Sequence, residues 1–540
     1  MDCHCIPYTR VPHSSKLLLD YLYQFERVAR FYTGPPFEPA SYRALAGDLN
    51  GFLPNRKPLI EALKRQNRTF ESGDATFANI DRLGNSGTFA VVAGQQVGLL
   101  SGPAFTLYKA LTAVRLAQSL SDQGVPAVPV FWLATEDHDL EEVAQTAILD
   151  EEYNFVALSD PGDRPAPHSP VGAVRISAGI TATLDRLQAT LPAGEAREKL
   201  LQDIRECYRP GAGWGTAFGR LMAKLFKSWG VVLVDPLGED VHDLGAAAYE
   251  HALAHSADLR ALLRERSDLL VRAGYHAQVH VPEDSTLLFV TRDGNRVPLH
   301  ERGGKFFVGG EEANAGTLKT EAIQRPLGFS GNVLLRPIMQ DLLLPTLAYV
   351  AGPSELAYFA QAQALYASFG RPMPIIFPRA GFTLVDRRAQ RLFEKYAVTV
   401  EDVWQGEEHL DRKIAAAGLA QGWSERFDQS ENELAALLER LRKDIATLDP
   451  TLLPTLTHAE EKIKYQLEKV RGKLSRAALQ RSDLLARHAQ SLRRLLVPQK
   501  DLQERQVSGV YFLGRAGYEL LDRIFAQIQV RSSDHQVLFY

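Results

Sequence analysis

The stretch TFAVVAGQQVGLLSGPAFTLYKALTAVRLAQSLSDQGVPAVPVFWLA, residues 88–134, decides the fold. Two apolar runs, Thr88–Ala93 and Val128–Ala134, lack strict polar alternation, as strands buried on both faces of a parallel sheet do. Between them, Phe105–Gln118 carries apolar residues at helical spacing and is followed by a Gly124-Val125-Pro126 break. The stretch therefore predicts a strand-helix-strand unit of Rossmann type.

The same pattern continues along the chain. Gly230–Asp235 and Pro374–Phe377 are further short apolar runs that end in acid or proline. A helix predicted over Phe218–Trp229 leads directly into the first of them. We therefore expect an α/β protein with a doubly wound, parallel-sheet core.

Two stretches interrupt the core with signals of antiparallel strands. Ala147–Ile176 has alternating segments around Asp160-Pro161-Gly162. Ser285–Val308 reads as strands separated by turn residues at 292–295 and 302–304. We interpret both as small inserted lobes.

Beyond about Asp386, glycine becomes rare and long helical patterns dominate. A helix over Glu431–Leu448 is followed by Asp449-Pro450, which turns the chain back. Apolar or small positions then alternate in steps of four and three with one extra step of four, which is a heptad seam with a stutter. The positions are 463, 467, 470, 474, 478, 481, 485, 488, 492 and 495. Arg481 and His488 are the charged or polar exceptions. An antiparallel coiled-coil arm is the simplest interpretation, and two amphipathic helices lying flat on the body are the alternative.

These patterns divide the chain as follows: 1–146, N-terminal half of the Rossmann-like core; 147–180, first inserted lobe; 181–274, core continuation; 275–325, second inserted lobe; 326–385, end of the core; 386–500, α-helical coiled-coil arm; 501–540, a C-terminal segment that returns to the core.

Composition restricts the class of protein. With 540 residues, 45% hydrophobic and 23% charged, the chain is long enough for more than one structural unit and has an ordinary globular balance. The net charge of −4 gives no basic excess, so we expect no nucleic-acid partner. The N-terminus lacks a signal-peptide pattern and no apolar run approaches the ~20 residues of a spanning helix, so we expect no membrane segment. Only three cysteines are present, as is typical of a reducing compartment, and we expect a cytoplasmic protein.

A glycine-rich loop lies between the first predicted strand and helix. Gly94, Gly98 and Gly102 allow backbone N–H groups to approach a ligand, and the following helix N-terminus favours an anion. The loop matches neither the dinucleotide fingerprint nor the P-loop, so a tight structural turn is the alternative. The polar neighbours that would contact a ligand are Gln95, Gln96, Tyr108 and Lys109.

An acidic cluster follows the next predicted strand and consists of Glu136, Asp137, His138 and Asp139. At the carboxyl ends of parallel strands it would face the same crevice as the glutamines. It can hold an ammonium group, raise the pKa of the histidine for proton transfer, or bind a divalent cation. A helix N-terminus capped by Asp137 or Asp139 is the alternative. No zinc-binding motif is present, and no zinc is expected.

Three further features could line the crevice. His276 and Gln278 alternate on a predicted strand, Tyr275–His280, where a polar strand face is the alternative. Arg336 is a candidate fork for a carboxylate or phosphate, or else a tie between domains. Glu355 lies where a strand, a glycine turn and a helix follow one another, at a second edge of the crevice.

Several of these blocks together resemble the bacillithiol-biosynthesis cysteine-adding enzyme family. The resemblance covers nearly the whole chain and rests on the blocks 93–99, 101–103, 108–109, 131–139, 335–337, 344–346, 348–353, 377–379 and 502–505. It implies a Rossmann-like core with two connecting insertions, similar to class I nucleotidyltransferases, and a coiled-coil arm through which the family forms homodimers.

The resemblance also implies the last step of bacillithiol synthesis, in which cysteine is joined through an amide to the amino group of glucosaminyl malate. Activation of the cysteine carboxyl would need ATP, with ATP or ADP bound. Glu136, Asp137 and Asp139 would then hold the cysteine ammonium or a divalent cation, and His138 would accept a proton from the attacking nitrogen. Gln95, Gln96 and Lys109 would orient the activated carboxyl, while Arg505 would meet phosphate and Tyr511 would stack on a base.

Two alternatives to this ligase remain. One is a nucleotide-binding scaffold or sensor with a degenerate site. The other is a nucleotidyltransferase-like enzyme acting on a different small amine.

Overall fold

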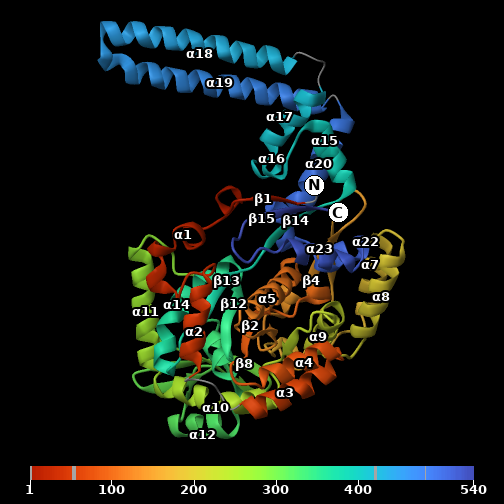
Figure 1. Ribbon diagram of the computed structural model, residues 1–540, viewed down its shortest axis with the longest axis vertical. Coiled ribbons are helices and arrows are strands. Elements are labelled where there is room, and N and C mark those ends of the chain that lie inside the picture. The colour runs from red at the N-terminus through yellow and green to blue at the C-terminus, as the bar shows by residue number, and fades with distance from the viewer. Residues whose placement is uncertain (1–2, 51–55, 419–422, 481) are drawn as a thin grey trace.

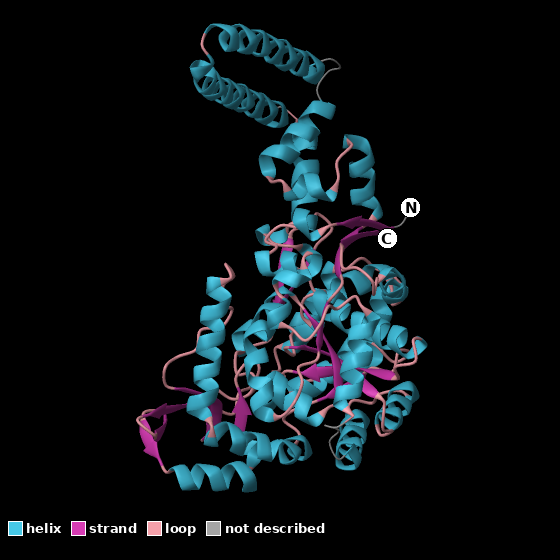
Figure 2. Ribbon diagram, turned by 60° about the vertical axis from the view of Figure 1, so that its left-hand side comes forward, coloured by secondary structure: helices cyan, strands magenta, loops and turns pink. Residues whose placement is uncertain are grey.

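The computed structural model describes residues 3–50, 56–418, 423–480 and 482–540. They form a body of helices around strands, from which a helical hairpin projects on a smaller group of helices (Figures 1 and 2). None of the helices in these ranges combines the length and the apolar character needed to cross a bilayer.

The central sheet is parallel and has the strand order β13-β12-β2-β3-β6. Its strands are β2 (Phe89–Gln95), β3 (Ala127–Leu133), β6 (Val232–Val234), β12 (Thr346–Ala351) and β13 (Ile375–Pro378). The first strand of this sheet in chain order, β2, lies in its middle, so the order reverses between β2 and β12. This is the doubly wound Rossmann arrangement, and it confirms the predicted class.

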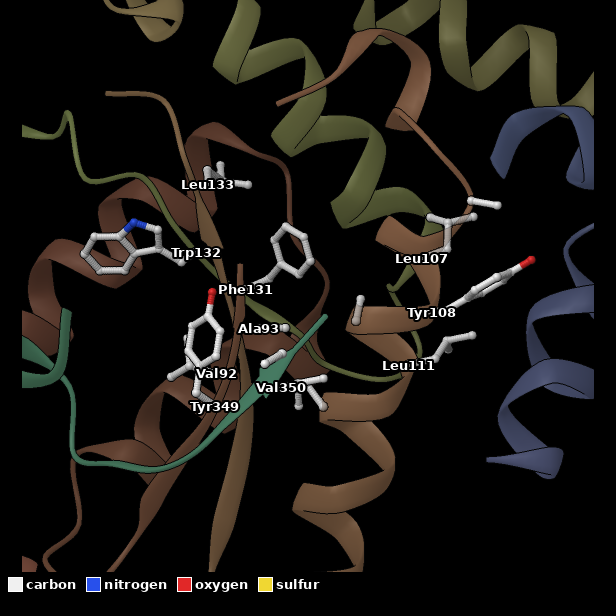
Figure 3. Packing of buried hydrophobic residues seen from close by; sticks show 14 of the residues in the cluster. Val92, Ala93, Leu107, Tyr108, Leu111, Phe131, Trp132, Leu133, Tyr349 and Val350 are labelled. Carbon is white, nitrogen blue, oxygen red and sulfur yellow. The ribbon is translucent and has the colours of Figure 1, made fainter. Parts of the chain in front are cut away.

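Helix α5 (Phe105–Asp122) connects β2 to β3 and covers one face of the sheet. In Figure 3, Phe131 and Val350 point from the strands toward α5, while Trp132 and Tyr349 project from the opposite side. All these side chains are buried. The strand-helix-strand unit is therefore confirmed, with a buried aromatic layer on the side away from α5.

Further helices surround the sheet. Those that pack against its strands are α2 (Pro39–Leu49), α3 (Arg56–Thr69), α4 (Asp74–Leu83) and α14 (Pro353–Tyr366). The predicted helix before β6 is α9 (Trp214–Leu225). The others in the body are α1 (Lys16–Tyr23), α6 (Leu140–Val143), α7 (Ile180–Thr190), α8 (Glu195–Cys207), α10 (Glu239–Ala254), α11 (Ser256–Arg272), α12 (Ala315–Gln324) and α13 (Arg336–Leu343).

The first inserted lobe is a two-stranded antiparallel hairpin, β4 (Gln145–Leu149) and β5 (Phe155–Ser159). The sequence predicted a turn at Asp160-Pro161-Gly162. The structure has the turn at residues 150–154 instead. The carboxylate of Asp150 accepts hydrogen bonds from the backbone N–H groups of Glu152 and Asn154, each 2.8 Å long, and this closes the turn.

The second lobe is a five-stranded antiparallel sheet of order β10-β9-β8-β7-β11. Its strands are β7 (Ser285–Arg292), β8 (Asn295–Arg302), β9 (Lys305–Val308), β10 (Glu311–Ala313) and β11 (Phe329–Gly331). Both predicted turns are confirmed, since Asp293 and Gly294 have φ of 50° and 76°, and Gly303 and Gly304 have φ of 58° and 77°. The predicted strand Tyr275–His280 is wrong, because this segment is an irregular link without strand partners between α11 and β7.

The C-terminal segment returns to the body through α21 (Gln503–Gln506), α22 (Gly509–Ala516) and α23 (Glu519–Gln527). It ends in β15 (His535–Phe539), which lies between β1 (Cys3–Ile6) and β14 (Gly381–Val385). The two chain ends therefore meet in one small sheet at the base of the arm (Figure 1).

The arm is an antiparallel hairpin of α18 (Trp423–Leu448) and α19 (Leu453–Gln480), turned at Asp449-Pro450 as predicted. At its base lie α15 (Arg387–Tyr396), α16 (Val400–Trp404), α17 (Glu407–Gly418) and α20 (Asp483–Leu496). The hairpin projects rather than lying flat on the body (Figure 2).

The prediction of one continuous heptad seam from 463 to 495 is wrong, because two separate helices, α19 and α20, share these residues. Ser482 caps a new helix, α20, by accepting the N–H of Leu485 at 3.4 Å. Leu485, Leu492 and Leu495 are buried among the base helices, whereas Ile463, Val470 and Leu474 of α19 are exposed. Position 481 lies outside the described residues.

Candidate functional site

A cavity of ≈ 590 Å³ opens at the carboxyl ends of β2, β3 and β12, where the strand order reverses. Ligands of open α/β sheets bind at this place. Its walls include the predicted residues Gly94, Gln95, Gln96, Lys109, Glu136, Asp137, Arg336, Glu355 and Arg505. The structure therefore brings together most of the side chains that the sequence singled out.

Lys109 fixes the floor of this cavity. Its buried Nζ donates to the Gly94 carbonyl at 2.8 Å and to Gln95 Oε1 at 2.9 Å, and forms an ion pair with Glu355. Burial lowers the pKa of Lys109, and the Glu355 carboxylate opposes this effect. The pair joins the helices that follow β2 and β12, so its first role is to hold the two edges of the crevice together.

Two further groups, besides Lys109, hold the carboxylate of Glu355. The Gly352 N–H donates to its Oε2 at 2.7 Å, and the Tyr349 hydroxyl donates to its Oε1 at 2.9 Å. The glycine turn and first helical turn after β12 therefore present a fixed carboxylate to Lys109.

One wall is acidic. Gln96 Nε2 donates to Asp137 Oδ2 at 3.0 Å and to Glu142 Oε2 at 2.7 Å, which holds two carboxylates side by side. Burial alone would raise the pKa of Asp137, but the hydrogen bond from Gln96 and the nearby arginines keep that pKa below its usual value. A charged pair of carboxylates at a cavity wall suits a ligand ammonium group.

His138 and Asp139 do not face the cavity. His138 Nδ1 lies 3.0 Å from Nη1 of Arg296, and its ring packs near Phe289 of the second lobe. Burial and the arginine lower the pKa of His138, so the expected rise is wrong. Asp139 accepts the Glu142 N–H at 3.1 Å and caps α6, which confirms the helix-cap interpretation for this residue.

The cavity is also lined by cationic side chains. Arg336, at the start of α13, and Arg379, after β13, both line the cavity. Arg296 of the second lobe is fixed there by hydrogen bonds to Ser330 Oγ and the Gly331 carbonyl, both 2.8 Å, and by stacking on Phe289. Three guanidinium groups and at least two carboxylates therefore line one cavity, and Arg296 and Arg336 lie near enough to Asp137 to act on its pKa.

The C-terminal segment orients Arg379. The Glu504 carboxylate accepts hydrogen bonds from the two terminal nitrogens of Arg379, at 2.6 and 3.0 Å. It also accepts one from the Phe382 N–H at 2.9 Å. Both partners are buried, and Arg379 holds the pKa of Glu504 below its usual value against the effect of burial. Residues more than a hundred positions apart in the sequence thus complete one cavity wall.

Two adjoining cavities receive other predicted residues. Gly98, Gly102 and Arg505 line one of ≈ 600 Å³ beside the first lobe, and it shares Gln95 and Gln96 with the main cavity. His276, Gln278 and Arg505 line another of ≈ 470 Å³ next to the N-terminal segment.

Tyr108 and Tyr511 are not brought to any of these cavities. Tyr108 points away from Trp132 and Tyr349 and packs against Phe382 (Figure 3). Tyr511 is 0% exposed in the core. A stacking surface for a base is therefore not offered by Tyr511, because its ring is enclosed by protein.

Sequence reasoning missed Glu142, Arg296, His242 and Glu504 as site residues. Glu504 lies in the block 502–505 and Glu142 follows the block 131–139, but their roles depend on contacts across the fold. Arg296 directly follows a predicted hairpin turn, the one signal that could have drawn attention to it. His242 lies inside α10 and carries no local signal.

The acidic residues do not converge as metal ligands. Asp139 is used as a cap and Glu136 faces His242, away from Asp139. Within the described ranges, no group of three His, Cys, Asp or Glu side chains is arranged to hold a metal ion. The geometry of these residues therefore does not fit a divalent-cation site.

Comparison with known proteins gives matches over the whole chain. The family model described as "Bacillithiol biosynthesis BshC, N-terminal Rossmann-like domain" matches residues 1–380. The model described as "Bacillithiol biosynthesis BshC, C-terminal coiled-coil domain" matches residues 382–540.

Curated relatives agree with these models. A protein of Solibacter usitatus named "Putative cysteine ligase BshC" is 37% identical and covers 100% of both chains. Proteins of the same name from Koribacter versatilis and Salinibacter ruber are 35% and 32% identical, covering 96% and 97% of this chain and 96% of each relative.

Proposed function

The chain belongs to the bacillithiol biosynthesis BshC family, and from this we propose that it is a ligase that joins cysteine through an amide bond to the amino group of glucosaminyl malate. The observation that carries the proposal is the cavity at the switch point of the sheet, which is lined by both carboxylates and guanidinium groups.

The carboxylates and guanidinium groups of the cavity match the charges of the two substrates. The cysteine ammonium binds the carboxylates of Asp137 and Glu142, which Gln96 holds together. The malate moiety brings two carboxylates, and Arg336 and Arg379 offer guanidinium groups for them. Bound in this way, the amino group and the cysteine carboxyl meet near the centre of the cavity.

Activation of the cysteine carboxyl is the second part of the proposal. An amide does not form usefully from a free carboxylate in water, and a nucleoside triphosphate supplies the leaving group. Gly98 and Gly102 at the start of α5, together with Arg505, fit the phosphates of such a nucleotide in the adjoining cavity. Gly102 has φ of 65°, and a Cβ at Gly98 would lie 2.9 Å from Gly102 Cα, so this tight loop requires glycine.

The test is direct. Purified protein is incubated with cysteine, glucosaminyl malate and ATP, and bacillithiol is sought by mass spectrometry. Omission of each substrate in turn, and of ATP, gives the matched controls. Product that depends on all three supports the proposal, and product without a nucleotide refutes the activation step alone. If no product forms while both substrates bind, the ligase assignment fails.

A further inference from the structure

Glu136 and His242 form a buried pair that the substrate contacts of the proposed function do not use. Glu136 lines the cavity and is 7% exposed, while His242 of α10 is 2% exposed. His242 Nε2 lies 3.3 Å from Glu136 Oε1. This is an ion-pair distance, but the geometry falls short of an aligned hydrogen bond, so the buried nitrogen has no hydrogen-bond partner in the described chain.

The other ring nitrogen fixes the tautomer. His242 Nδ1 lies 3.1 Å from the carbonyl oxygen of Pro326, which can only accept a hydrogen bond. Nδ1 therefore carries a proton, and Nε2 directs either a lone pair or a second proton at Glu136. When Nε2 carries the second proton, that proton lies between the imidazole and the carboxylate.

The groups around this pair are few. Tyr249 of α10 stacks on the His242 ring, with its hydroxyl 3.4 Å from Nδ1. The charges of Asp235, at the end of β6, and of Arg296, in the second lobe, also act on the pair.

His138 is placed unfavourably for the same task. Its Nδ1 accepts a hydrogen bond from Arg296, so the neutral ring carries its proton on Nε2. To take up a second proton at Nδ1 it would have to displace the arginine. It also does not line the cavity, whereas Glu136 does.

We propose that Glu136 is the general base for the attacking amine and that His242 is the positioning residue that holds its carboxylate. This rests on the proposed function. The amino nitrogen attacks the cysteinyl carbonyl carbon and the C–N bond forms. The C–O bond to the phosphate of the activated carboxyl breaks, with its electron pair leaving on oxygen. The proton released by nitrogen passes to Glu136.

The first test replaces the base. Glu136→Gln keeps the size and polarity of the side chain but cannot accept the proton, so kcat should fall by about 10²- to 10⁴-fold while the KM for glucosaminyl malate changes little. His251→Gln, on α10 like His242, is the control, since His251 contacts Ser368 and lines no cavity that we describe. Unchanged kcat in Glu136→Gln would overturn the proposal.

The second test separates positioning from folding. His242→Gln keeps an N–H near the position of Nε2, whereas His242→Asn keeps one only near Nδ1. We expect kcat to fall much further in the Asn variant than in the Gln variant, at similar KM and similar melting temperature. Equal kcat in the two variants, or losses that follow the melting temperature, would mean that His242 is only structural.

Failure of this proposal can be told from failure of the ligase assignment. If wild-type protein makes bacillithiol and Glu136→Gln does so equally fast, only the base is wrong. If wild-type protein makes none, the function is wrong. In that case ¹⁵N-histidine NMR still reports whether the His242 ring signals change in Glu136→Gln, and no change would refute the shared proton.

Discussion

At the scale of single residues, the three arginines of the cavity differ in what holds them. Arg379 is neutralised by Glu504 and Arg296 is fixed by neutral oxygens and by His138. Arg336 interacts with Tyr349 and Tyr358 and feels the charge of Asp137, and no carboxylate of the described chain forms an ion pair with it. Its charge is therefore the one most available to a ligand carboxylate.

Arg336→Gln should weaken binding of glucosaminyl malate. A charge-assisted hydrogen bond contributes about 1.5–3 kcal/mol, so we expect KM to rise by roughly 10- to 150-fold with a smaller effect on the KM for cysteine. Steady-state kinetics with each substrate varied in turn measures this. Arg292→Gln, at an exposed hairpin end of the second lobe, is the control. An equal rise for both substrates would argue against a malate contact.

His535 is a buried histidine beneath the Arg379–Glu504 pair. Its Nε2 lies 2.8 Å from Thr383 Oγ1. Burial lowers the pKa of His535 to about 4; Glu504 opposes this and Arg379 adds to it. The folded protein thus binds fewer protons at this site than the unfolded chain between pH 4 and about 6.5.

The stability from this site is therefore complete above about pH 6.5 and is lost as the pH falls toward 4. The slope is at most about 1.4 kcal/mol per pH unit for one proton. Thermal unfolding at pH 7 and at pH 5 should show a smaller drop in melting temperature for His535→Gln than for the wild type. Parallel drops in the two proteins would exclude His535 as a source of acid sensitivity.

At the scale of elements, the interrupted seam shows how one sequence pattern serves two structures. The steps of three and four continue across residue 481, but α19 belongs to the projecting hairpin and α20 to the base of the arm. Both halves need an apolar stripe, and the stripe does not reveal which partner will cover it. The cap at Ser482 marks the boundary.

Substitution on α20 should confirm that its stripe is covered by this chain. Leu492 is 0% exposed, so Leu492→Ala should lower the free energy of unfolding by about 2–5 kcal/mol. Leu484, on the same helix, is 48% exposed, and Leu484→Ala should change it by no more than about 0.5 kcal/mol. Denaturant or thermal unfolding compares the two. Similar effects would place α20 differently from the structure described here.

At the scale of the whole molecule, the hairpin extends away from the body (Figure 1). Part of its apolar surface is exposed. Leu438 and Leu456 pack between α18 and α19, while other apolar side chains are exposed; these are Leu437, Leu441, Leu448, Ile463, Val470 and Leu474. Surfaces of this kind mark interaction sites. We propose that the hairpins of two copies pair in a homodimer.

Charges placed in this surface should separate the two copies. In the double variant Leu467→Asp/Leu474→Asp, the partly buried position 467 and the exposed position 474 each place a carboxylate in the proposed dimer interface, at a cost of several kcal/mol if it stays unpaired. Light scattering should then report a monomer, and circular dichroism an unchanged body. Lys462→Asp on the same helix is the control for charge alone. An unchanged dimer mass in the double variant would place the interface elsewhere.

Local signals in the sequence determined the parallel core strands, α5, the hairpin turns of the second lobe and the turn of the arm. Each of these depends on neighbouring residues, through apolar runs, helical spacing or the positive φ of glycine. Only the tertiary structure decided the chemistry of the cavity, because its contacts join distant parts of the chain: Arg296 to His138, Arg379 to Glu504 and His242 to Glu136. The direction of a charged side chain is set by the field and burial of the folded surroundings, and no local pattern of residues carries that information.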